Sequence, residues 1–142
     1  MSQLRRKARQ LAAQALYQWE LAKQNVGEVE AQFQEEHGGA KVDWEYFHDL
    51  LFGVTTSLSD VDTKLSEFLD RALDETSLVE RAILRMSFFE LMMRPDVPYR
   101  VIINEAVDIT KKYGSDQGHR YVNGILDKAA TQLRGAEVRS PR

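Results

Sequence analysis

Apolar residues recur along this chain at steps of three and four positions, which is the repeat of an amphipathic α-helix. The first apolar stripe begins at Leu4, has Ser2 as its predicted N-cap and fades near Asn25. A short second helix is predicted over residues 29–36, and Asp43 is predicted to cap a strongly patterned third helix. No stretch of strand-like alternation competes with these helices, so the pattern predicts an all-α protein.

The same repeat continues in the second half of the chain. The segment 59–62 (Ser-Asp-Val-Asp) has the form of a capping box and is predicted to open a fourth helix that continues through Ala72. A clearer box at 77–80 (Ser-Leu-Val-Glu) precedes a helix that is apolar on nearly every side, which predicts a central, buried position. Two prolines then make the segment 94–98 a rigid break between helices.

Two more helices complete the predicted fold. Gly114 is the expected end of the sixth helix, and the seventh is expected to stop before Gly135. The sequence therefore predicts about seven helices in a single domain over residues 1–142. A break near 74–77 is expected to divide the domain into packed subdomains, at about 1–76 and 77–135, with a flexible tail over 136–142.

The composition indicates the cellular compartment in which the protein is expected. The chain has no cysteine, which excludes disulfides and thiolate metal sites and fits a reducing cytosol. No apolar run approaches the roughly 18–20 residues that span a bilayer, and the N-terminal cations are not followed by the apolar stretch of a signal peptide. We therefore expect a soluble, cytoplasmic protein that does not bind membranes.

Signatures of catalysis are also missing from the sequence. The three histidines have no metal-ligand spacing, and no phosphate-cradling glycine loop or nucleophile elbow occurs. The polar pairs Asn104-Glu105 and Asn123-Gly124 interrupt apolar helices and are interpreted as structural, with Gly124 expected to admit a neighbouring backbone. The sequence thus predicts no enzyme, no metal and no cofactor.

Charge is distributed unevenly along the chain. Residues 1–19 hold 4 basic and no acidic residues, residues 20–96 hold 7 basic and 17 acidic, and residues 97–142 hold 8 basic and 5 acidic. The net charges of these segments are +4, −10 and +3, which together give the −3 of the whole chain. Basic ends favour a polyanion as ligand, and an acidic middle favours a basic partner.

Cations at two predicted helix starts oppose the helix macrodipole, which indicates that another requirement selected them. The helical repeat predicts that those of the first helix fan over its surface and stay out of the core, although a merely solvated helix start is an alternative. The segment 111–121 interleaves cationic or titratable side chains with two tyrosines, the combination that single-stranded RNA requires. The two groups of cations are Arg5, Arg6, Lys7 and Arg9 in the first helix and His119 and Arg120 in the last.

Tyr17 and Glu80 are two further candidate positions, the first for a binding role and the second for a structural role. Tyr17 lies nearly opposite the apolar stripe of its helix, where an exposed aromatic ring favours a binding role. Glu80 is the acidic member of the 77–80 capping box, which is a sufficient structural role by itself.

Seven sequence blocks, in this order and spacing, are highly specific together. They are Arg5–Arg9, Ala15–Trp19, Tyr46–Leu51, Val79–Arg85, Asp96–Tyr99, Ile103–Val107 and Tyr121–Asp127. With these blocks the chain closely resembles the family of the bacterial transcription antitermination factor NusB, over essentially residues 3–133.

The resemblance implies a fold of two small helical bundles and a role without catalysis. It implies pairing with the ribosomal protein NusE, binding of boxA RNA in nascent ribosomal transcripts, and read-through in an elongation complex with other Nus factors and RNA polymerase. The implied partner contacts are Tyr17 and Glu80. The implied RNA contacts are Arg5, Arg6, Lys7, Arg9, Tyr113, Gly114, Gln117, His119, Arg120 and Tyr121, with Gln117 standing where some relatives carry a carboxylate.

Two other functions are compatible with a small helical domain of this kind. A similar domain precedes the catalytic module of an RNA cytosine methyltransferase, so a non-catalytic leader domain is the alternative. A DNA-binding helical protein is less favoured, because no helix-turn-helix pair concentrates its basic residues on one recognition helix.

Overall fold

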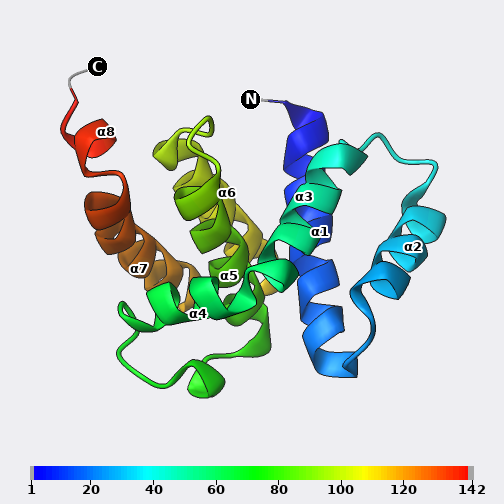
Figure 1. Cartoon of the computed structure of the whole chain (residues 1–142), viewed down its shortest axis with the longest axis horizontal. Helices are drawn as coiled ribbons and strands as arrows, with labels where there is room; N and C mark the ends of the chain where they lie inside the picture. Colours follow the sequence, from blue (N-terminus) through cyan, green and yellow to red (C-terminus); the bar gives the residue numbers. More distant parts are fainter. Residues whose placement is uncertain (1, 141–142) are drawn as a thin grey trace.

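The computed structural model describes residues 2–140, and within this range the protein is all α-helical (Figure 1). The predicted fold class is confirmed, with eight α-helices in the described residues where about seven were expected. The elements are α1 (Gln3–Ala22), α2 (Val26–His37), α3 (Trp44–Thr56), α4 (Leu58–Ser66), the 3₁₀ turn η1 (Leu73–Glu75), α5 (Leu78–Met93), α6 (Tyr99–Tyr113), α7 (Gly118–Leu133) and α8 (Gly135–Arg139).

Most predicted helix boundaries are confirmed by their capping contacts. The Ser2 hydroxyl accepts hydrogen bonds from the first backbone N–H groups of α1. Asp43 accepts from the N–H of Tyr46 in α3, and Ser77 accepts from the N–H of Glu80 in α5. These side chains satisfy donors that have no partner inside their own helices.

The fourth helix departs from the prediction at both ends. It begins at Leu58, because Ser57 ends α3 and starts α4 in a single turn, and no side chain caps it. It ends at Ser66 and does not continue through Ala72. The N–H of Phe68 bonds to the carbonyl of Leu65 in a tight turn, and the Phe68 ring packs on the core from that turn. Apolar spacing alone did not distinguish this packed turn from another helical turn.

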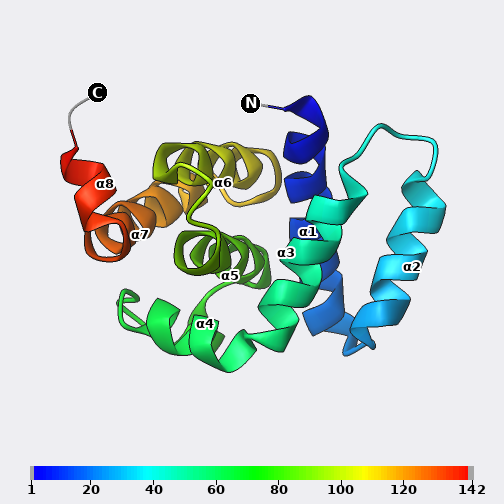
Figure 2. The same ribbon diagram turned by 45° about the horizontal axis from the view of Figure 1, so that its top comes forward.

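Helix α5 lies at the centre of the molecule, as its apolar surface predicted (Figure 2). It packs against α1, α3 and α4 on one side and against α6 and α7 on the other. The buried apolar side chains of both halves belong to one continuous core. The division into two subdomains near residue 76 remains a prediction from the sequence.

The C-terminal segment contains a short helix that the sequence did not predict. Residues 135–139 form α8, and Val138 packs against the core. The Arg134 guanidinium donates to the Leu91 and Val97 carbonyls and to Glu137, which ties α7 and α8 to the end of α5. The sequence predicted a flexible tail over 136–142, of which residues 136–139 are helical here and residues 141 and 142 lie outside the described part of the chain.

Glu137 also caps α6 from another helix, which gives a testable contribution to stability. Pro98 precedes α6 and offers no side-chain cap, so the Tyr99 N–H donates to the Glu137 carboxylate at 2.9 Å. We expect Glu137→Ala to lower the free energy of unfolding by about 1 kcal/mol, the usual value of a lost N-cap. Urea denaturation at pH 7 measures this difference, and equal stabilities would contradict the capping role.

The effect of Glu137→Ala should also depend on pH. Partial burial raises the pKa of Glu137, but the Tyr99 N–H and the Arg134 guanidinium outweigh burial and lower the pKa below its ordinary value of 4.5. A carboxyl whose pKa is lowered on folding stabilises the protein above its unfolded pKa and loses that effect as the pH falls through the folded pKa. The difference in melting temperature between the two proteins should therefore shrink as the pH falls from the ordinary glutamate range through the lower pKa that Glu137 has in the folded state.

No helix in the described residues is long and apolar enough to cross a membrane.

Candidate nucleic-acid interface

Basic side chains from three helices line one groove of about 590 Å³. Arg6 comes from α1, Lys111 from the end of α6, and His119 and Arg120 from the start of α7. The turn over residues 114–117 places the last turn of α6 next to the first turn of α7. The two basic ends of the sequence thus meet in space, and we call this surface the basic groove.

Arg6 is held in the basic groove by two carboxylates of α6. Its Nε donates to Glu105 Oε2 at 3.0 Å, and its Nη2 donates to Asp108 Oδ2 at 2.9 Å. The Arg6 side chain remains 41% exposed, whereas Glu105 is buried and Asp108 is half exposed. Arg6 is therefore positioned by α6 and still accessible to a ligand.

Arg9 corrects the prediction that all the N-terminal cations lie on the surface. Its side chain is only 1% exposed, and its Nη2 pairs with Glu90 Oε2 of α5 at 2.9 Å. Helix α1 contacts α2, α3, α5 and α6, so its buried face is wider than one apolar stripe and includes position 9. A direct contact between Arg9 and RNA is incompatible with this burial.

The Arg9 site is a small buried polar cluster. The Tyr46 hydroxyl donates to the Glu90 carboxylate, and Arg9 Nη1 lies 3.5 Å from Glu105 Oε1. Burial, together with the negative charge of Glu90, raises the pKa of Tyr46, which keeps the hydroxyl protonated as a donor. Burial alone would lower the pKa of Arg9, but the hydrogen bond and charge of Glu90 outweigh it, so the net shift is upward.

The other two N-terminal cations lie nearer the surface. The guanidinium carbon of Arg5 lies 4.1 Å from the centroid of the Tyr46 ring, and its Nε lies 3.9 Å from Asp43 Oδ2. Lys7 is half-buried. Neither residue lines the basic groove, so only Arg6 of the four N-terminal cations contributes to it.

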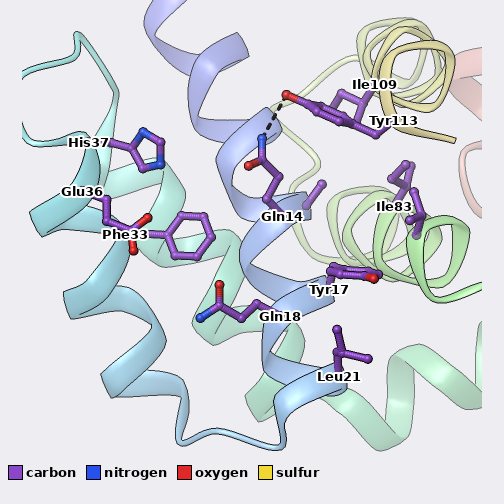
Figure 3. A pocket seen from close by; sticks show the side chains of 12 residues that line it. Gln14, Tyr17, Gln18, Leu21, Phe33, Glu36, His37, Ile83, Ile109 and Tyr113 are labelled. Carbon is purple, nitrogen blue, oxygen red and sulfur yellow. Dashed lines mark hydrogen bonds between the residues drawn. The ribbon is translucent and has the colours of Figure 1, made fainter.

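The two predicted tyrosines lie outside the basic groove. The Tyr121 hydroxyl donates to Asp70 at 3.5 Å, and the Arg71 guanidinium carbon lies 4.5 Å from the centroid of the Tyr121 ring, so Tyr121 faces the connection between α4 and α5. Burial raises the pKa of Tyr121. The Tyr113 hydroxyl accepts from Gln14 at 3.0 Å and lines another groove (Figure 3).

The turn between α6 and α7 carries the two remaining predicted RNA contacts. Gln117 is exposed and precedes α7 without capping it by its side chain. Gly114 ends α6, as predicted, and a Cβ there would come within 2.9 Å of Thr110. Thr110 belongs to α6, so a side chain at position 114 would crowd the last turn of that same helix.

Sequence reasoning missed the polar residues of the basic groove on α6 and α7. Asn104 and Asn123 are exposed and line the groove, although both were interpreted as structural. Gly124 is exposed and a Cβ there would meet nothing within 4 Å, so its expected close backbone contact is wrong. A signal for these residues was present in the sequence. The helical repeat places Asn104 on the same face of α6 as Lys111, and Asn123 on the same face of α7 as Arg120.

A second groove, of about 460 Å³, crosses the outer face of α1 and is predominantly apolar. Tyr17 lines it, but its ring is half-buried and packs against the core, so it is less exposed than the helical repeat predicted. Figure 3 shows Tyr17 between Leu21 of α1 and Ile83 of α5, with Phe33 of α2 on the other side of α1. Leu21 is 56% exposed, an apolar side chain that the sequence analysis did not single out.

Glu80 stands beside this apolar groove but is mostly buried. Its carboxylate accepts a hydrogen bond from Ser115 at 3.4 Å, and a Cβ at Gly118 would approach Glu80 Oε2 to 2.5 Å. The carboxylate thus lies against the N-terminus of α7, where the helix dipole favours negative charge. Glu80 therefore connects α5 with α7, and little of it is available to a partner.

Comparison with known proteins identifies the family of this fold. The family model described as the NusB family matches residues 6–131. The chain belongs to the NusB family. The transcription antitermination protein NusB of Alcanivorax borkumensis is 54% identical, over 97% of this chain and 93% of the relative. That of Pseudomonas savastanoi pv. phaseolicola is 52% identical, over 96% of this chain and 82% of the relative.

Solved structures of the NusB family have the same fold. T. maritima NusB superimposes with a TM-score of 0.80 at 33% identity, covering 93% of this chain and 94% of that one. A crystal structure of the antitermination factors NusB and NusE in complex with dsRNA contains a chain with a TM-score of 0.82 at 29% identity, covering 96% of this chain and 99% of that one. Within residues 2–140 no three His, Asp or Glu side chains gather to hold a metal ion.

Proposed function

We propose that this protein is an RNA-binding transcription antitermination factor that pairs with the ribosomal protein NusE and binds boxA RNA in nascent transcripts. The observation that carries the proposal is the convergence of Arg6, Lys111, His119 and Arg120 in one groove. The exposed cations of α6 and α7 in this groove supply the charge that an RNA backbone requires. A relative in complex with NusE and dsRNA supports this assignment.

The proposal places the protein in the cytoplasm, in an elongation complex with other Nus factors and RNA polymerase, as a non-catalytic adaptor. Relatives named antitermination proteins, which the match covers over 93% and 82% of their own length, favour this role over that of a methyltransferase leader domain. The basic groove and the exposed Gln117 of the α6–α7 turn form the proposed RNA surface. Arg5 and Lys7 extend that surface along α1, and Arg9 supports it from the core.

The apolar groove is the proposed surface for NusE. The exposed Leu21 and the half-buried Tyr17 line it, and residues 20–96, from the end of α1 to just beyond α5, carry the net charge of −10 that suits a basic ribosomal protein. Glu80 contributes by holding the start of α5 against the start of α7.

RNA binding with and without NusE tests the proposed function. Fluorescence anisotropy would compare boxA RNA, a scrambled RNA of the same composition and duplex DNA. We expect preference for boxA RNA and tighter binding when NusE is present. Equal affinity for the three nucleic acids, unchanged by NusE, would contradict the proposal.

Replacement of Tyr17 tests the partner surface separately. Truncating a buried interface tyrosine costs about 2 kcal/mol, so we expect Tyr17→Ala to weaken NusE binding roughly 30-fold. Calorimetric titration of NusE measures this loss. Tyr17→Phe is the matched control, because it keeps the ring that packs in the groove, and it should bind NusE nearly as the wild type does. Unchanged NusE affinity in Tyr17→Ala would place the interface elsewhere.

A further inference from the structure

The basic groove contains cations in two different electrostatic situations. Arg6 makes ion pairs with Glu105 and Asp108 at 3.0 and 2.9 Å. Lys111 and Arg120 are exposed, and no carboxylate of residues 2–140 lies within 4.0 Å of either charge. We therefore expect the interaction of Arg6 with a phosphate to differ from that of Lys111 or Arg120.

The charge around Arg6 is unfavourable for a phosphate. Two carboxylates contact its single positive charge, and the deeper one is shared with Arg9. The connected set of Arg6, Arg9, Glu90, Glu105 and Asp108 holds two cations and three anions. A phosphate at Arg6 would thus approach a cluster with a net charge of −1, whereas at Arg120 it would meet an uncompensated cation.

The hydrogen-bonding capacity of Arg6 is only partly used. A guanidinium has five N–H donors in one plane. The Nε donor is taken by Glu105 and one Nη2 donor by Asp108, which leaves both Nη1 donors and one on Nη2. This remaining edge matches two adjacent acceptors, such as O6 and N7 of guanine. A neutral base edge accepts these bonds without the repulsion that a phosphate meets.

We propose that Arg6 recognises the edge of a base, with guanine as the expected base, while Lys111 and Arg120 bind phosphates. Glu105 and Asp108 act as positioning residues that orient the Arg6 guanidinium and cancel its attraction for phosphate. The inference rests on the proposed RNA-binding function and assigns the specificity of that surface. The neutral amides of Asn104 and Asn123 line the same groove, and amides are also suited to base edges.

The salt dependence of RNA binding separates a base contact from a phosphate contact. Each phosphate neutralised on a single strand contributes about 0.7 to the slope of log K against log salt. We expect Arg120→Ala to lower the slope by about that amount and to keep the preference for boxA RNA over scrambled RNA. Arg6→Ala should leave the slope unchanged and reduce the preference about tenfold. Lys23→Ala, about 25 Å away at the other end of α1, is the control and should change neither.

A modified RNA identifies the base. Each guanine of boxA RNA is replaced in turn by 7-deazaguanine, which lacks the N7 acceptor. At one position the replacement should weaken binding to the wild type and have no further effect on Arg6→Ala, because both changes remove the same contact. A loss of slope in Arg6→Ala with the preference for boxA RNA retained would overturn the inference.

Asp108→Asn provides a test that does not depend on the folding of Arg6→Ala. Asp108 is exposed, and the asparagine oxygen still accepts from Arg6. Removing this charge frees Arg6 to attract phosphate, so we expect tighter binding to every RNA, a steeper slope and a weaker preference for boxA RNA. An unchanged slope and preference would overturn the inference. Failure of the wild type itself to prefer boxA RNA would instead overturn the proposed function.

Discussion

Arg9→Ala is expected to lower the free energy of unfolding by about 3–5 kcal/mol, because it leaves buried carboxylates without their cation. Glu90 would lose both hydrogen bonds from Arg9 Nε and the one from Nη2, and Glu105 would keep only Arg6. A typical domain is stable by only 5–15 kcal/mol. RNA binding would then fall through loss of the folded state, although Arg9 does not reach the RNA surface.

Urea denaturation monitored by circular dichroism measures this loss. The double variant Arg9→Met/Glu90→Gln is the informative control, since it removes both charges and keeps an acceptor for the Tyr46 hydroxyl. We expect it to recover at least half of the stability lost in Arg9→Ala. A wild-type unfolding midpoint for Arg9→Ala would show that Arg9 is not the buried ion that the structure describes.

Reversing the two unpaired cations of the basic groove is expected to have the largest effect on RNA binding. The double variant Lys111→Glu/Arg120→Glu removes two proposed phosphate contacts and adds two repulsive charges. We expect a loss of affinity of about a hundredfold or more at roughly 0.1 M salt, with the slope of log K against log salt reduced by about 1.4. Anisotropy titrations over a range of salt concentrations measure both quantities.

The fold should tolerate this double reversal. Lys111 lies in the last turn of α6, where glutamate opposes the helix dipole, and Arg120 lies in the first turn of α7, where glutamate favours it. These effects are opposite in sign, so the melting temperature should stay near that of the wild type. Lys23→Glu, far from the groove, is the control for charge reversal outside it, and it carries half of the double variant's change in overall charge. Undiminished RNA affinity of the double variant would exclude the groove as the RNA surface.

The positions of these charges show which kinds of contact a sequence can predict. Caps such as Ser2, Asp43 and Ser77 were predictable, because each bonds to a backbone group two or three residues away. The ion pairs of Arg6 join residues 99 and 102 positions apart. No local pattern encodes such a pair, so the carboxylates that restrain Arg6 were not predicted.

The burial of Arg9 and the neighbours of Tyr121 were not predicted, for a related reason. Both lie on the flank of an apolar stripe, where the helical repeat leaves the environment undecided. Neighbouring helices cover Arg9, and the connection between α4 and α5 reaches Tyr121. Tertiary packing therefore decided the environment of each side chain.

The sequence by itself determined the helical class, the central place of α5, most helix ends and the family, because these follow from local spacing, capping and ordered blocks along the chain. Only the tertiary structure decided which basic residues share a groove. It buried Arg9, directed Tyr113 to the apolar groove and paired Arg6 with α6. The physical reason is that the burial and the ion pairs of a side chain depend on the residues packed against it. In this protein those residues come from helices that are distant in the sequence.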